Sequence, residues 1–250
     1  MEEKKELWWL NLTQLAIPVK LLFTGYLVVI SFGFLAAGLQ ILLTHGMADG
    51  KPGVSVEDIV YSHYGNRTGS KLEKALNGSM KEYATPEERL KIIEWVRKGA
   101  PDDEMKKEIM PIIQKRCAMC HQSTPDMNIT KPEVLKKFAE VDTGASIGLL
   151  TRDSHIHLFG MAFIFILLGF VFSFSININP FLKSTLILTP FIFQLIDIFA
   201  WWITKFFPEF AWFVIIGGFG YFAASGLMIL ISLYQMWIMK PTEGNAWEIS

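Results

Sequence analysis

Residues 21–43 read LLFTGYLVVISFGFLAAGLQILL and contain no charged side chain. A helix needs about 20 consecutive apolar residues to cross a bilayer, so this run predicts a membrane span. The run is longer than the apolar part of a cleaved signal peptide, and no small-residue cleavage pattern follows it. We therefore expect an uncleaved signal anchor. Gly33 and Ala37 have the small-residue spacing that allows a second helix to pack closely.

Three further apolar runs predict three further spans. They cover about residues 158–176, 184–203 and 210–239. The connections between them are so short that neighbouring spans are expected to be antiparallel. Gly220 and Ala224 repeat the small-residue spacing in the last of these spans.

The uneven distribution of charge divides the chain. Charged residues make up 19% of the sequence, whereas soluble domains carry about 25%. Most charged residues lie between the first and second apolar runs, which predicts an all-α protein with a polar, helical insert after the first span of a four-helix transmembrane bundle. The expected segments are 1–43 (interfacial segment and first span), 44–152 (insert), 153–239 (three spans) and 240–250 (tail). The net charge of −1 offers no basic field for nucleic acid, so the lipid bilayer is the expected partner.

Lysine and arginine residues near the span ends predict the orientation, because they are enriched in cytoplasmic loops. With four spans, one side of the membrane receives Lys4, Lys5, Lys20, Lys183 and Lys240. The opposite short loop carries Lys205 alone, although Arg152 beside the second span counts against this assignment. We expect both termini in the cytoplasm, Trp8 and Trp9 at the headgroup level, and the insert on the other side.

Helix signals dominate the insert. The sequence Thr85-Pro86-Glu87-Glu88 has the pattern of a capping box with proline at the first helical position, and Gly99 is placed to end that helix. Between them, an apolar stripe runs at helical spacing. We expect further helices over residues 103–116 and 131–140.

Residues 117–121 read CAMCH, which is the pattern C-x-x-C-H. At this spacing one helical turn presents two thiols to the two vinyl groups of a haem, and the next residue offers an imidazole to the iron. Cys117 and Cys120 are the only cysteines in the sequence. We therefore predict one haem c, bound covalently through Cys117 and Cys120 and ligated by His121.

Two other interpretations of the cysteine pair are weaker. A structural zinc site usually needs four ligands, and the sequence has no second cysteine pair. A thioredoxin-type dithiol belongs to a βαβ setting, which the helical pattern does not provide. Because haem is attached covalently outside the cytoplasm, the motif and the charge count independently predict the same location for the insert.

Residues 105–140 resemble the opening half of small, class I-like bacterial c-type cytochrome domains, in which a helix such as Glu108 to Arg116 runs into the haem motif. Residues 65–100 resemble the closing half, in which a loop methionine precedes an acidic-capped helix with a tryptophan, here Trp95. The halves occur in reversed order, which indicates a circular permutation or two half-repeats. The resemblance covers less than half of the chain, and only the C-x-x-C-H motif within it is specific.

The resemblance implies that Met80 is the distal ligand of the haem iron. If the domain runs in the usual order, His155 or His157 takes that position, because the chain after the motif reaches them next. His63 ranks third, and Met127, in the loop after the motif, is a weaker choice. A five-coordinate iron is a further alternative.

Ionisable residues at the outer membrane edge form a second candidate site. Asp197 lies inside the third predicted span, where an acidic residue is rare and is a functional hypothesis by default. Gln194 and Trp201 share its helical face, while His157 and His45 lie near the outer ends of other spans. A quinol releases protons when it is oxidised, so His157, Asp197 and Trp201 are candidate quinone-site residues. The structural alternative is a buried aspartate that is satisfied by histidine or backbone of a neighbouring helix.

These features predict a membrane-bound monohaem c-type cytochrome that transfers electrons within a respiratory redox complex, with a link to the quinone pool as a further expectation. One alternative is a quinol-oxidising enzyme subunit with its own quinone site, and another is a haem-based sensor. Whether the chain is an enzyme is therefore left open. The resemblance implies the bacterial inner membrane, a periplasmic haem domain, and other respiratory-chain subunits or cytochromes as partners.

Overall fold

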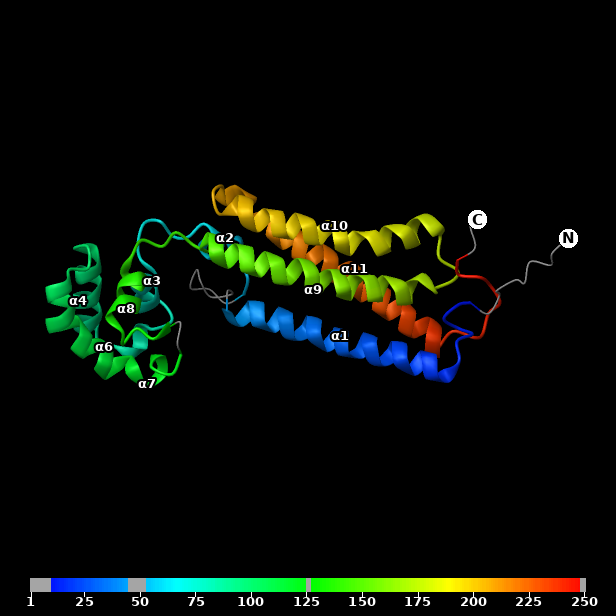
Figure 1. Cartoon of the computed structure of the whole chain (residues 1–250), viewed down its shortest axis with the longest axis horizontal. Helices are drawn as coiled ribbons and strands as arrows, with labels where there is room; N and C mark the ends of the chain where they lie inside the picture. The colour runs from blue at the N-terminus through cyan, green and yellow to red at the C-terminus, as the bar shows by residue number, and fades with distance from the viewer. Residues whose placement is uncertain (1–9, 45–52, 125–126, 248–250) are drawn as a thin grey trace. The chain divides into compact units, whose positions relative to one another are not determined.

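The chain divides into two compact units in a computed structural model that describes residues 10–44, 53–124 and 127–247 (Figure 1). One unit comprises Met1–Thr44 together with Ile147–Ser250, and the other comprises His45–Ser146. The described residues form helices joined by turns and loops, with one isolated bridge between Ser70 and Val141. The prediction of an all-α fold is confirmed.

Four long helices build the first unit (Figure 1). They are α1 (Ile17–Thr44), α9 (Ile147–Ser173), α10 (Pro180–Thr204) and α11 (Ala211–Trp237), with the short 3-10 helix η4 (Pro208–Phe210) before α11. Each is long and apolar enough to cross a membrane, which confirms the predicted four-helix transmembrane bundle. Helix α9 begins earlier than the apolar run at about residue 158, because the polar residues Thr151, Arg152 and Asp153 extend the helix without interrupting it.

Glycines on α11 let α10 approach closely. A Cβ atom added to Gly217 would collide with the backbone of Asp197, and one added to Gly220 would enter the ring of Phe193. Ala224, one turn further along α11, is buried. The predicted close packing at Gly220 and Ala224 is confirmed.

On α1, by contrast, no described helix packs closely against the small residues. No atom lies within 4 Å of a Cβ placed on Gly33, and Ala37 is exposed. Small residues at this spacing permit a close contact, but they do not supply the second helix that makes it.

Residues 10–13 and 242–246 form a structure that we call the terminal clasp. The side-chain amide of the fully buried Asn11 donates hydrogen bonds to the carbonyls of Thr242 (3.2 Å) and Gly244 (2.8 Å). The Ala246 N–H donates to the Leu10 carbonyl at 3.0 Å. The clasp therefore joins the two chain ends at one end of the bundle. The predicted interfacial residues Lys4, Lys5, Trp8 and Trp9 lie outside the described residues.

Gln235 of α11 supports the turn that follows α9. Its side-chain oxygen accepts a hydrogen bond from the Ile176 N–H at 3.0 Å, and its amide nitrogen donates to the Ile176 carbonyl at 2.8 Å. Both bonds are buried, so one side chain satisfies both backbone groups of Ile176.

Gln235→Leu should lower the melting temperature of the purified protein, because leucine leaves the buried N–H and C=O of Ile176 without partners. Each group left unpaired costs about 1–3 kcal/mol. Thermal unfolding in detergent, followed by circular dichroism, measures the loss. Tyr234→Leu at the exposed neighbouring position is the control. An unchanged melting temperature for Gln235→Leu would contradict this role.

Short helices build the insert. They are α2 (Val56–His63), α3 (Lys71–Asn77), the 3-10 helix η1 (Lys81–Tyr83), α4 (Pro86–Arg97), α5 (Asp102–Glu104), the π-helical η2 (Met105–Ile109), α6 (Met110–Arg116), α7 (Ala118–His121) and α8 (Pro132–Ala139). The predicted capping box is present, since Thr85 and Glu88 each bond the other's backbone N–H. Gly99 follows α4 with a φ of +89°, which favours glycine.

The predicted helix over residues 103–116 is present but not uniform. It passes from α5 through the π-helical turn η2 into α6. Pro111, near the start of α6, lacks the N–H that a regular α-helix would use, and π turns arise where the regular hydrogen-bond ladder is interrupted. A sequence pattern for an uninterrupted helix does not reveal this change.

The core of the insert lies between α4, the η2–α6 segment, α3 and α8. Trp95, Ile109 and Ile113 are fully buried there, and Trp95 Nε1 donates to the Pro101 carbonyl at 3.0 Å. Cys117 packs against the edge of the same cluster. The C-x-x-C-H motif therefore begins at the core of the insert.

The two ends of the insert cross one another closely. The Asp142 N–H donates to the Gly69 carbonyl and the Ala145 N–H to the Ser62 carbonyl, both at 2.9 Å. A Cβ added to Gly65 would collide with the backbone of residues 142–144, and Gly65 has a φ of +87°. Only glycine fits at this crossing.

Candidate functional site: the C-x-x-C-H turn and the membrane cluster

The C-x-x-C-H motif forms one helical turn. Cys117 ends α6, and α7 contains the rest of the motif. The Cys117 carbonyl accepts hydrogen bonds from the backbone N–H groups of Cys120 (3.3 Å) and His121 (3.0 Å). Because Ile113, one turn before Cys117, is fully buried, α6 fixes the start of the motif on the core of the insert.

The imidazole of His121 is oriented by a backbone carbonyl. Its Nδ1 atom lies 3.1 Å from the carbonyl oxygen of Met127. A carbonyl oxygen only accepts, so this contact favours the tautomer in which Nδ1 carries the proton and the lone pair of Nε2 is available to a metal. Metal-binding histidines typically donate their second ring nitrogen in this way. Sequence reasoning considered Met127 only as a weak iron ligand and missed this role of its carbonyl.

The Cys117 thiol does not have the character of a thiol that exchanges disulfides. Both cysteines are free, with Cys117 half-buried and Cys120 exposed. Burial raises the pKa of the Cys117 thiol, and the nearby Cys120 and Glu88 act in the same direction. Thiols that exchange disulfides have a lowered pKa, because the thiolate is the attacking species. The thioredoxin-type interpretation therefore does not fit Cys117.

A bare-metal site is not formed by the part of the chain that the structure describes. Among residues 10–44, 53–124 and 127–247, no three His, Cys, Asp or Glu side chains gather as such an ion requires. A structural zinc site usually has four protein ligands. The C-x-x-C-H turn does not meet this requirement with its described neighbours.

The segment that carries Met80 is tied to the helix of the motif. Glu88 at the start of α4 pairs with Arg116, the residue before Cys117, at 2.9 Å. Arg89 donates to the Leu76 carbonyl at the end of α3 at 3.3 Å. Leu76, before Met80 in the chain, is thus held close to α4, and Glu88, after Met80, is held close to α6.

The histidine candidates for the distal position have other neighbours. His63 ends α2, and its carbonyl lies against Gly144 at the crossing described above. His155 and His157 belong to α9 in the first unit. The His155 ring lies 5.1 Å from the Phe159 ring, whereas His157 has Trp201 as its ring neighbour. The two imidazoles therefore do not share one face, as their spacing predicts.

The candidate quinone residues come together in the first unit. The ring of His157 stands edge-on to Trp201 with 5.0 Å between centroids, and Trp201 Nε1 donates to the Asp197 carboxylate at 2.9 Å. Gln194 Nε2 donates to the His157 carbonyl at 2.7 Å. Asp197 is only 6% exposed, and its described side-chain donor is an indole rather than the histidine or backbone group that the structural alternative assumed. His45 lies outside the described residues.

An apolar groove of about 390 Å³ lies on a different face of α10. Its lining includes Ile196, Phe199 and Ile203 of α10 and Phe213 of α11. At helical spacing these α10 residues point away from Trp201. The groove is therefore not the space beside the His157 and Trp201 rings.

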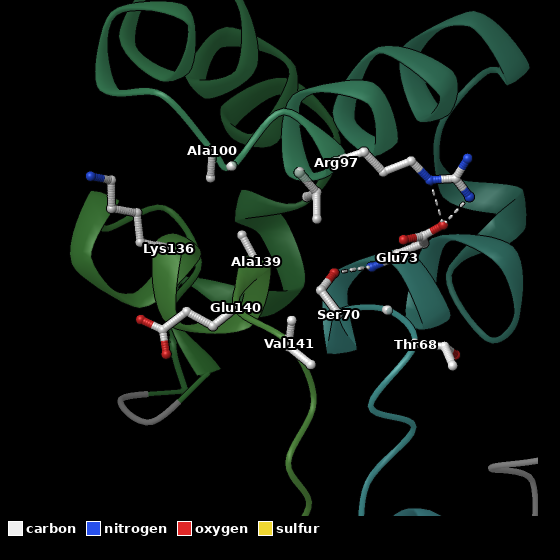
Figure 2. Close-up of a pocket in the computed structure, with 12 residues that line it drawn as sticks. Thr68, Ser70, Glu73, Arg97, Ala100, Lys136, Ala139, Glu140 and Val141 are labelled. Carbon is white, nitrogen blue, oxygen red and sulfur yellow. Dashed lines mark hydrogen bonds and ion pairs between the residues drawn. The ribbon is translucent and has the colours of Figure 1, made fainter.

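The larger cavity, of about 810 Å³, lies in the insert between α3, α4 and α8 (Figure 2). Two of its charged groups are paired, since Arg97 binds Glu73 and Lys136 lies 2.7 Å from Asp102. None of the candidate ligands of the haem iron lines this cavity. It is therefore separate from the C-x-x-C-H turn.

Comparison with known proteins finds a similarity in the membrane part of the chain. A family model described as a transmembrane helical domain matches residues 137–243. No curated protein and no solved structure matches the chain. The matched residues include α9, α10 and α11, so the spans and the family match together define a multi-pass membrane protein.

Proposed function

We propose that this chain is a membrane-anchored monohaem c-type cytochrome that transfers single electrons in a respiratory redox complex. The observation that carries the proposal is the C-x-x-C-H turn in which the Met127 carbonyl fixes Nδ1 of His121 and leaves Nε2 for iron. The haem would supply a centre that gains and loses one electron. The residues of the chain hold that centre and set its environment.

The residues around the motif fit a haem. Cys117 and Cys120 would anchor the porphyrin through thioethers, and His121 would bind the iron from one face. Three large side chains of the insert are exposed: Met80 by 36%, Met127 by 47% and Tyr83 by 59%. An apolar porphyrin would cover such groups, and Met80 would supply the distal thioether.

The bacterial inner membrane, with the insert in the periplasm, is the location that suits this function. Covalent haem attachment outside the cytoplasm and the lysine distribution support it. Another cytochrome or a membrane-bound redox subunit would then exchange electrons with the haem. The bilayer that holds the spans would keep the haem domain near such partners.

A reduced-minus-oxidised spectrum and a pyridine haemochrome spectrum of the purified chain test this function. The proposal expects the haemochrome band of a haem whose vinyl groups have become thioethers, at one haem per chain. It also expects reversible reduction and reoxidation of that haem. A preparation with no haem, or with a b-type haem that organic solvent extracts, would refute the proposal.

A second candidate function is quinol oxidation by the chain itself, and the cluster of His157, Trp201 and Asp197 favours it. A carboxylate and an imidazole linked through one indole could accept the protons that a quinol releases. This function would use the membrane unit as a site rather than only as an anchor.

Asp197→Asn should slow haem reduction by a quinol analogue by tenfold or more if this second function holds, because an amide cannot accept the proton. Positioned acid–base groups typically contribute about 10²–10⁴-fold. Stopped-flow spectroscopy of the purified chain, without partners, measures the rate. Ile198→Val, a conservative change at the buried apolar position next to Asp197, controls for disturbed packing. If wild type is not reduced by the quinol at all, the second function is wrong and the first is unaffected.

A further inference from the structure

Two lysines of the membrane unit bind backbone carbonyls in place of acidic groups. Lys20 Nζ donates to the carbonyls of Thr13 (3.0 Å) and Met236 (2.8 Å). Lys183 Nζ donates to the carbonyls of Ser175 (2.9 Å) and Ala246 (2.8 Å). Each ammonium has three donors, so one N–H of each lysine is left over from these bonds.

Each of the two lysines donates to a carbonyl of the terminal clasp. Thr13 and Ala246 belong to the clasp itself, and the Leu12 N–H donates to the Phe174 carbonyl, next to Ser175, at 2.9 Å. Backbone segments that are distant in sequence therefore hold the two ammonium groups at the same end of the bundle. Both side chains are partly exposed.

The charge of these lysines is not neutralised by the described part of the chain. Neither Lys20 nor Lys183 belongs to an ion pair that the structure shows among the described residues. A cation at the edge of the low-dielectric bilayer is stabilised by an anion more than by neutral carbonyls alone.

Tryptophans mark the depth of this end in the membrane. Trp237 and Trp247 are about half exposed, at 47% and 51%, while their indole nitrogens donate to Thr24 and Ser173. Half-exposed indoles of this kind are typical of the headgroup region. The anions that are abundant at this depth are the phosphates of phospholipids.

We infer that Lys20 and Lys183 form a built site for the phosphate of an anionic phospholipid. The backbone carbonyls of the clasp and of the helix ends hold each ammonium in place, and the remaining N–H of each lysine binds lipid phosphate. The site would attach the end of the bundle that carries the terminal clasp to the anionic leaflet, in agreement with the proposed cytoplasmic side. The inference does not depend on haem or quinone.

Native mass spectrometry of the full-length protein, exchanged from detergent into mixed phosphatidylglycerol and phosphatidylcholine, tests the site. Wild type should retain phosphatidylglycerol preferentially. Lys20→Gln and Lys183→Gln keep a donor for the carbonyls but remove the charge, and each should weaken retention about fivefold. Lys20→Arg and Lys183→Arg keep the charge and should retain the lipid.

Lys240→Gln is the matched control, because Lys240 is exposed and follows α11 at the same end of the bundle. It should leave retention nearly unchanged. Inorganic phosphate added with phosphatidylcholine should not replace phosphatidylglycerol, which distinguishes a lipid site from a site for free phosphate. Equal retention of both lipids by wild type would overturn the inference, and so would an equal loss in Lys240→Gln. If a glutamine variant does not fold, the comparison of phosphatidylglycerol with phosphatidylcholine on wild type still tests the inference.

Discussion

The double substitution Cys117→Ala and Cys120→Ala should abolish covalent haem while leaving the membrane unit folded. Both thioethers would be lost, and His121 alone would have to retain the haem. Denatured protein on a gel should therefore change from full haem staining to none. The bundle should persist, because neither cysteine belongs to it and its helices pack through their own apolar core.

Met119→Ala provides the matched control within the same turn. The Met119 side chain lies between the two cysteines but is 92% exposed, so its loss should not affect haem attachment. Haem staining that survives the double cysteine substitution would contradict the proposed attachment. Loss of staining in Met119→Ala as well would show only that the turn tolerates no change.

Met80→Ala should open a coordination position on the haem iron. Wild type is expected to show the weak near-infrared band of sulfur-to-iron ligation in the oxidised state, and the variant should lose it and bind carbon monoxide when reduced. Met80→His should also remove the band and lower the reduction potential, because a thioether ligand raises the potential relative to a second imidazole. Optical spectroscopy and a redox titration measure these effects.

Other outcomes of the Met80 experiment distinguish the remaining alternatives. Met127→Ala is a matched control, since this methionine also lies in an exposed loop and uses its backbone carbonyl for His121. A spectrum unaffected by Met80→Ala, combined with an open position in His155→Ala or His157→Ala, would show that the domain runs in the usual order. Carbon monoxide binding by wild type would favour the sensor alternative.

The helices of the membrane unit could largely be predicted from sequence, because length and apolar composition determine a span almost alone. The start of α9 could not, since polar residues such as Arg152 continue a helix beyond its apolar part. Small-residue spacing indicated the packing at Gly220, where Phe193 lies against it, but no described helix covers the same spacing at Gly33. A spacing rule describes one helix surface and contains no information about which helix covers it.

In the candidate sites, too, the arrangement of residues within one helix could be predicted from sequence, whereas contacts between segments distant in sequence could not. Helical spacing predicted that Gln194, Asp197 and Trp201 share a face, and the structure adds their contacts with α9. The carbonyl that orients His121 comes from a loop with no motif. The terminal clasp around Lys20 joins residues from opposite ends of the sequence. From the sequence alone, Lys20 and Lys183 indicate only the orientation of the chain in the membrane.

The intact mass of the denatured full-length chain tests the central claim most directly. The chain should be purified from cells that attach haem to c-type cytochromes, unfolded in acid and organic solvent, and measured by mass spectrometry. The proposal predicts the mass of the polypeptide plus one haem, because two thioether bonds survive unfolding. The mass of the unmodified polypeptide, from cells in which another c-type cytochrome carries its haem, would contradict it.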